Sequence, residues 1–450
     1  MKPSRKPASE TDDLFRSRLE NIIDMGHQLV RLGEAIDWAF FDDAYDAFYS
    51  EEGRPGIPTR MMVGVHILKH MFDLSDEGVC ERWVYDPYFQ YFCGEEYFQF
   101  ELTIERSSMT RWRDRIGPQG LEKVFQESLG VAHRTGALRT KDLKRVTVDT
   151  TVQEKAITFP TDAKLMHKAR QRLVRLAREH GVPLRQSYVR VGKRALIMQG
   201  RYRHAKQHKR AGKAMRKLKT YLGRTIRDIR RQTRHDPEVR QAFLHPLWLA
   251  QRVMTQKRRD PSPKVYSLHA PEVECIGKGK AHKPYEFGCK VSVAATNKRA
   301  PGGQFVTHVR AFHGNPYDGH TLKTVIEEME SWTGISIERA YVDKGYRGHD
   351  YPNKLKVYTS GQKRGITPTI KKELRRRSAV EAVIGHLKTD GRLGRNFLKG
   401  RDGDKINAIL AGAGYNYRRV LRWLRLLFAR IMAAIFKAMR PSFTTMTNPA

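Results

Sequence analysis

Three carboxylates occupy positions where a folded chain could hold them together. Asp149 ends the β-rich run VTVD at 146–149, and Asp343 ends the similar run AYVD at 340–343. A strand end fixes a carboxylate in space and suits a metal ligand, although Asp after a strand often only begins a turn. Glu381 lies in RRRSAVEAVIGHLK at 375–388, a segment with helical periodicity. We treat these three residues as one candidate catalytic and metal-binding set.

Charged residues around Glu381 extend this set. Arg377 precedes Glu381 by four residues, and Lys388 follows it by seven. We predict a single helix over about 371–389, which would place all three side chains on one face. A ladder of ion pairs also accounts for the spacing, but not for the pairing of this helix with two aspartates at strand ends.

The ligand types favour one kind of metal. Carboxylate oxygens suit Mg²⁺ or Mn²⁺, and no Cys/His cluster accompanies them as a zinc site would require. Two such ions about 4 Å apart can activate an attacking oxygen and stabilise a leaving oxygen at phosphorus. Arg377 and Lys388 would then hold DNA phosphates beside the metals.

Charge gives an independent indication of the partner. The chain of 450 residues has 84 Lys and Arg but 48 Asp and Glu, a formal net charge of +36. Such a balance favours a polyanion, since basic residues that neutralise phosphates release condensed counterions. An anionic membrane surface would also attract this charge. Basic residues interrupt the apolar segment 420–440, which indicates a basic amphipathic helix and no membrane span.

The cysteine usage suits a reduced cytosol. The four cysteines form no CxxC pair, and we expect neither a disulfide framework nor a zinc site. The N-terminal segment MKPSRKPASETDD has no apolar stretch after its basic residues, so we expect no signal peptide.

Residues 1–140 are predicted to form a helical N-terminal DNA-binding domain. Ser75 is a plausible N-cap, and a later helix that begins at Ser107 carries Arg111 and Arg113. Short helices with a basic last member are typical of a helix-turn-helix reader. A small helical bundle with a solvated charged face fits the same pattern equally well.

A basic helical insertion is predicted over 161–261. Residues 164–234 contain 24 Lys and Arg but only two acids, Glu179 and Asp228. A charge run is usually a solvated face, but this density would repel itself without a counter-anion. The candidate DNA contacts in this block are Lys206, Lys209, Arg210, Arg216 and Lys217.

The strand pattern predicts an α/β fold in which this helical block follows the first strand. We expect a buried central strand at 143–149 and further strands at 264–268, 285–295, 304–312 and 337–342. A helix is expected over 321–332. The catalytic core would comprise 141–160 and 262–400, with basic helices in 401–450.

Four motifs at these positions resemble the DDE transposases of bacterial insertion sequences, specifically the insertion-sequence-five-like family. They are TVDTT at 147–151, HGNPYDGHTL at 313–322, YVDKGYRG at 341–348 and RRRSAVEAVIGHLK at 375–388. The last fits an R-x3-E-x6-K signature, and the stretch 53–83 is similar to the helical domain ahead of the core. The family usually has Tyr three residues before the Arg, where this chain has Leu374.

The resemblance implies a ribonuclease-H-like core with Asp149, Asp343 and Glu381 as its triad for two Mg²⁺ ions, which Mn²⁺ can replace. It implies a homodimer or higher homo-oligomer on double-stranded DNA. The protein would cleave the terminal inverted repeats of its element and join the 3′-OH to target DNA. Three alternatives stay open: a nuclease without strand transfer, a decayed transposase that only binds DNA, and a protein of the membrane surface.

Overall fold

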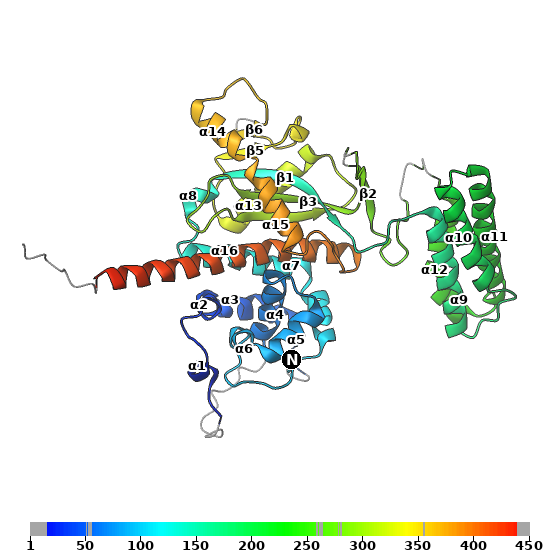
Figure 1. Cartoon of the computed structure of the whole chain (residues 1–450), viewed down its shortest axis with the longest axis horizontal. Coiled ribbons are helices and arrows are strands. Elements are labelled where there is room, and N and C mark those ends of the chain that lie inside the picture. The colour runs from blue at the N-terminus through cyan, green and yellow to red at the C-terminus, as the bar shows by residue number, and fades with distance from the viewer. Residues whose placement is uncertain are drawn as a thin grey trace, which may run out of the picture. The chain divides into compact units, whose positions relative to one another are not determined.

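The computed structural model describes residues 16–50, 52, 56–257, 260, 264–277, 279, 281–353 and 356–438. The chain divides into two compact units. We call Met1–Gln153, Lys290–Leu398 and Asp402–Ala450 the main unit, and Glu154–Cys289 with Lys399–Arg401 the insertion unit. Figure 1 shows the sheet and most helices in the first and the green helices in the second.

The sheet of the main unit has the strand order β4, β3, β1, β5, β6. These strands are β1 (Arg145–Glu154), β3 (Tyr285–Thr296), β4 (Val306–Phe312), β5 (Arg339–Val342) and β6 (Val357–Thr359). Strand β5 is parallel to both β1 and β6, whereas β3 and β4 are antiparallel to each other. The prediction of a buried central first strand is confirmed, because β1 lies between β3 and β5 with Val146 and Val148 fully buried.

Two strand predictions need correction. Strand β1 continues to Glu154, so Asp149 lies within the strand and does not end it. The predicted strand at 264–268 is wrong, because the described residues there form no ladder. Segment 264–268 is instead joined to the end of a helix, where Gln256 bonds both the backbone N–H and the C=O of Val265.

Apolar residues of α13 (Leu322–Thr333) pack against the sheet. Leu322, Val325, Ile326 and Met329 recur at helical spacing and are buried against the β1 and β5 side chains. The short helix η2 (Asp318–Thr321) leads directly into α13. Helices α14 (Pro368–Arg376) and α15 (Ala379–Thr389) follow β6 along the chain, and α8 (Thr140–Leu143) precedes β1.

The N-terminal part of the main unit is a set of helices around an aromatic core that includes Trp83, Phe89 and Phe92. Ser75 caps α5 (Asp76–Tyr85) by accepting the backbone N–H of Gly78 at 2.9 Å, as predicted. The helices are α1 (Leu19–Ile22), α2 (Gln28–Ala35), α3 (Trp38–Tyr45), η1 (Asp46–Phe48), α4 (Thr59–Met71), α5 (Asp76–Tyr85), α6 (Pro87–Phe92) and α7 (Arg106–Arg134).

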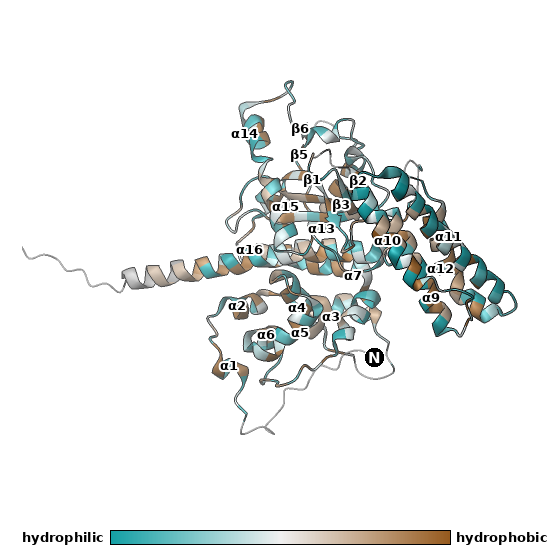
Figure 2. Ribbon diagram, turned by 45° about the vertical axis from the view of Figure 1, so that its right-hand side comes forward, coloured by the Kyte–Doolittle hydropathy of each residue, from teal (hydrophilic) through white to brown (hydrophobic). Residues whose placement is uncertain are grey.

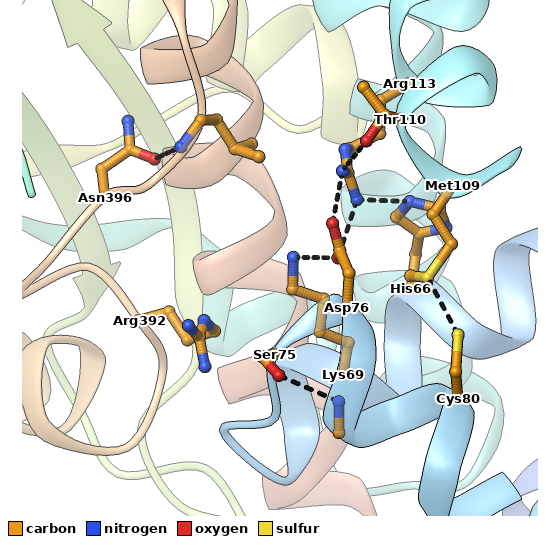
Figure 3. Close-up of polar contacts among 12 residues, drawn as sticks. His66, Lys69, Ser75, Asp76, Cys80, Met109, Thr110, Arg113, Arg392 and Asn396 are labelled. Atoms are coloured by element: carbon orange, nitrogen blue, oxygen red, sulfur yellow. Dashed lines mark hydrogen bonds and ion pairs between the residues drawn. The ribbon is translucent and has the colours of Figure 1, made fainter. Parts of the chain in front are cut away.

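A buried ionic cluster joins three of these helices (Figure 3). The Asp76 carboxylate at the start of α5 accepts hydrogen bonds from Lys69 Nζ at 2.6 Å and from Arg113 at 2.7 and 3.0 Å. The side chains of Lys69 and Arg113 are 7% and 4% exposed. The Arg113 guanidinium also lies 3.3 Å from His66 Nε2. The cluster therefore fixes α5 against α4 and α7 by a carboxylate between two cations.

Helix α16 (Gly400–Ala438) connects the helical part to the sheet. The Asn416 side chain donates to Ser128 Oγ of α7 at 3.0 Å and to the Val306 carbonyl of β4 at 2.9 Å, and it accepts the Val306 N–H. The buried amide has all of these partners in the protein, so it specifies how α16 docks.

We expect Gly414→Ala to destabilise the main unit by about 1–3 kcal/mol, since a Cβ there would lie 2.7 Å from the backbone of His70 in α4. Thermal unfolding of the purified chain measures this effect. Gly385→Ala in α15 is the matched control, because its Cβ would meet no atom within 4 Å and Ala favours a helix. Equal stability of wild type and Gly414→Ala would contradict the close backbone contact.

The insertion unit is built on four helices: α9 (Asp162–Glu179), α10 (Val189–His204), α11 (His208–Gln232) and α12 (Pro237–Thr255). Their apolar stripes form a core that contains Leu173, Leu222, Ile226 and Phe243. Hydrophilic and hydrophobic residues alternate along these helices in Figure 2. The unit also includes β2 (Glu274–Gly277), which pairs antiparallel with the start of β3. Among the described residues of the whole chain, no helix is long and apolar enough to cross a membrane.

Candidate active site

The parallel register of β1 and β5 brings two of the predicted carboxylates side by side. Val148 pairs with Val342. Asp149 directly follows Val148 in the sequence, and Asp343 directly follows Val342. Asp343 caps η3 (Lys344–Tyr346) by accepting the backbone N–H of Lys344 at 2.5 Å. Two neighbouring parallel strands therefore place these two carboxylates side by side, Asp149 within β1 and Asp343 directly after β5.

Asp149 is the electrostatically strained member of this pair. Burial, together with the negative charges of Asp343 and Asp318, raises the pKa of its carboxyl to about 6. The backbone N–H of Thr150 at 2.8 Å and the guanidinium of Arg377 at 3.6 Å act in the opposite direction. A desolvated carboxylate beside two others is stabilised by an added cation.

Asp318 is a residue of this site that the sequence motifs did not single out as functional. Its carboxylate accepts hydrogen bonds from Thr150 Oγ1 at 3.0 Å and from Lys290 Nζ at 2.8 Å. It also lies close to Gly345, where an added Cβ would be 3.1 Å from Asp318 Oδ2. The signal that could have found it is the motif HGNPYDGHTL, which contains Asp318.

Arg377 and Glu381 do not share one helix, and the prediction of a single helix over 371–389 is wrong. Helix α14 ends at Arg376 and α15 begins at Ala379. Between them the backbone tightens, with i to i+3 hydrogen bonds from the N–H of Arg377, Val380 and Glu381. Arg377 is 15% exposed and directed to Asp149. Its guanidinium is therefore already engaged with a predicted metal ligand.

Glu381 lies in the first turn of α15 and is exposed, whereas Lys388 in the last turn is half-buried. The structure gives Glu381 no contact with Asp149 or Asp343. Across the described residues, no three His, Cys, Asp or Glu side chains are grouped closely enough to hold a metal. Asp149 and Asp343 thus fit a divalent cation by their adjacency and by the raised pKa of Asp149, with Glu381 outside their immediate neighbourhood.

The predicted DNA contacts fall into two classes. Arg113 is 3% exposed and bound to Asp76, so it supports the helical core and we omit it from the proposed DNA contacts. Arg111 on the same helix is exposed and forms a surface ion pair with Glu105 at 2.9 Å. The five contacts predicted in the insertion unit are all exposed: Lys206 lies between α10 and α11, and Lys209, Arg210, Arg216 and Lys217 lie on α11.

Comparison with known proteins places this site in a family context. Residues 17–115 match the family described as Transposase domain (DUF772), and residues 270–417 match the family described as Transposase DDE domain. The α/β fold, its paired aspartates and these matches define the class as a transposase. A Rhizobium meliloti protein described as "Uncharacterized protein ORF8 in nfe locus" is 56% identical over 207 residues, 46% of this chain and the whole of that relative. No solved structure matches significantly.

The chain belongs to the DDE transposases of insertion sequences. The second match includes Asp343 and Glu381 and begins after Asp149. The first match covers the helices around the buried cluster at Asp76.

Proposed function

We propose that this transposase cleaves the ends of its element and joins the freed 3′-OH to target DNA at the site that contains Asp149 and Asp343. The single observation that carries the proposal is the register of β1 and β5, which sets these two carboxylates next to each other. A ribonuclease-H-like core is supported by the sheet, in which β5 and β6 follow β1 in parallel and β3 and β4 lie on its other side.

Asp149, Asp343 and Glu381 would hold the metal ions in this proposal. Two Mg²⁺ ions, or Mn²⁺ in their place, supply activation of the attacking oxygen and stabilisation of the leaving oxygen. Asp149 has to be deprotonated to serve as a ligand, and Arg377 at 3.6 Å favours that form.

Asp318 acts as a positioning residue. Its bond to Thr150 Oγ1 fixes the residue that follows Asp149, and its bond to Lys290 links β3 to the same point. We expect Asp318→Asn to weaken metal binding less than Asp149→Asn does, because the contact is through a neighbour.

Double-stranded DNA is the proposed partner, with the element's inverted repeats and the target bound by a homodimer or higher homo-oligomer. The proposed contacts are Lys388 in the last turn of α15, Arg111 on α7, and the exposed Lys206, Lys209, Arg210, Arg216 and Lys217 of the insertion unit. The proposed domains are residues 1–140 for DNA binding, 141–160 with 262–400 for catalysis, 161–261 for the insertion and 401–450 for the C-terminal helices. Of the last range, 439–450 lie outside the described residues.

The test is a cleavage and joining assay with the DNA that flanks the gene, a supercoiled target, and Mg²⁺ or Mn²⁺. We expect metal-dependent nicks at the element ends and joined products, and loss of both in Glu381→Gln with DNA binding retained. Cleavage without joining would indicate a nuclease. Retained cleavage in Glu381→Gln would remove this residue from the triad, and binding without cleavage in any metal would contradict the proposed chemistry.

A further inference from the structure

The insertion unit contains a cavity of about 680 Å³ beside α9. Its walls are the segment 157–160, one face of α9, the loop 266–271, His245 of α12 and Lys399. All of these residues belong to the insertion unit. The volume falls in the range of roughly 300–1,000 Å³ that is usual for ligand pockets.

The wall formed by α9 is strongly basic. Lys164, Lys168, Arg172 and Arg175 follow each other at intervals of four, four and three residues, so they share one face of the helix. Lys399 adds a fifth cation. The described residues that line the cavity include no Asp or Glu. Five cations around one concave surface repel one another unless an anion is bound between them.

Neutral acceptors orient two of these cations without cancelling their charge. Arg172 donates to the Leu268 carbonyl at 2.7 Å, and Lys168 Nζ donates to Thr158 Oγ1 at 3.2 Å. Arg175 forms a pair at 3.6 Å with Glu179, and both side chains are more than half exposed. Such an exposed pair is weak, so Arg175 keeps most of its attraction for a phosphate.

An exposed aromatic ring also lines this cavity. Phe159 is 64% exposed although its ring meets Phe287 edge-on at 5.5 Å. The ring of Tyr266, whose centroid is 5.4 Å from that of Phe287, also lines the cavity. Exposed aromatic rings beside a row of cations are the combination that binds nucleic acid strands, because bases stack on the rings while phosphates lie on the cations.

We propose that this cavity binds a segment of single-stranded DNA, with phosphates along the α9 row and an unpaired base on Phe159. The choice of DNA rests on the proposed function. A single strand fits better than a duplex, because duplex bases are stacked inside the helix and cannot reach a ring in a cavity.

The first experiment measures fluorescence anisotropy of the full chain with a labelled thymidine oligonucleotide of about 12 nucleotides, in EDTA to prevent cleavage. We expect Phe159→Ala to weaken binding by about 5- to 100-fold and to leave a duplex of equal length unaffected. The matched control is Tyr285→Ala, which removes a 52% exposed ring of the same unit that does not line the cavity. Unchanged oligonucleotide binding in Phe159→Ala would overturn the proposal.

The second experiment tests the basic row through salt dependence. Replacing Lys164 and Lys168 together by Gln should lower the slope of log K against log salt by about 1.4, or about 0.7 for each phosphate that the protein no longer neutralises. Arg224→Gln with Arg227→Gln is the matched control, since both arginines are exposed on α11 and away from the cavity. Equal slopes in the two double variants would overturn the assignment.

An RNA oligonucleotide of the same length distinguishes the kind of strand. Tenfold tighter binding of the RNA than of the DNA would contradict the assignment to DNA. The strand-binding results and the cleavage assay test the two proposals independently. Strand binding that depends on Phe159 supports the cavity even if the cleavage assay fails, and cleavage with Phe159-independent strand binding supports the chemistry alone.

Discussion

We expect Asp149→Asn to abolish the proposed cleavage and joining and, in the absence of metal, to make the protein more stable. The first effect follows because Asn cannot provide the anionic oxygen that the proposed metal site requires. The second follows from the raised pKa. Between pH 3.8 and about 6 the folded state binds a proton at Asp149 that the unfolded state has released. Stability therefore falls as pH rises through this window, and the cost is fully present above pH 6.

The rise from 3.8 to about 6 corresponds to about 3 kcal/mol, which is an upper bound since Asn also weakens the contact with Arg377. Thermal unfolding at pH 7.5 in EDTA measures the gain, and millimolar Mg²⁺ should stabilise wild type but not the variant. Asp402→Asn is the control, because that side chain is 70% exposed and forms only a local pair with Lys405. A variant that is less stable than wild type in EDTA would contradict the strained state of Asp149.

Asp76→Asn should cost the largest amount of stability of any single polar substitution discussed, about 3–5 kcal/mol. The substitution leaves Lys69 and Arg113 buried without their common counter-charge. Chemical denaturation followed by the fluorescence of the tryptophans measures the loss. Glu105→Gln is the matched control, since its pair with Arg111 is formed by side chains that are 79% and 67% exposed, and it should cost under about 1 kcal/mol.

The Asp76 cluster also has a defined pH dependence. The two cations hold the pKa of the Asp76 carboxyl well below its usual range. The stabilisation is complete above the unfolded pKa near 3.8 and is lost as pH falls toward the lower folded value. The difference between wild type and Asp76→Asn should therefore be fully present at pH 5 and shrink below pH 4. A constant difference down to pH 3 would contradict this linkage.

Sequence patterns predicted the elements whose residues are buried in a regular period. The apolar runs at β1 and β5 and the helical spacing in α13 are local signals, and the structure has these elements near the predicted positions. The adjacency of Asp149 and Asp343 then requires only that β1 and β5 pair in parallel.

The features that were missed depend on contacts between distant residues. The segment Arg377–Ser378 contains neither Gly nor Pro, so nothing local marks the break between α14 and α15. Arg377 is engaged by Asp149, more than two hundred positions earlier. In the same way, the charge of Arg113 suggested a DNA contact, but its burial against Asp76 is visible only in the folded helices.

The chain passes from β1 into the insertion unit and returns to β3 at neighbouring positions. The backbone N–H of Lys155, just after β1, donates to the carbonyl of Phe287 in β3 at 2.9 Å. The chain thus leaves and re-enters the sheet at two adjacent points, although 131 residues separate Lys155 from Phe287. Ends so close together can be joined by a short turn or by a different domain without moving either strand. The insertion unit can therefore change in length or content while β1 and β3 keep their places in the sheet.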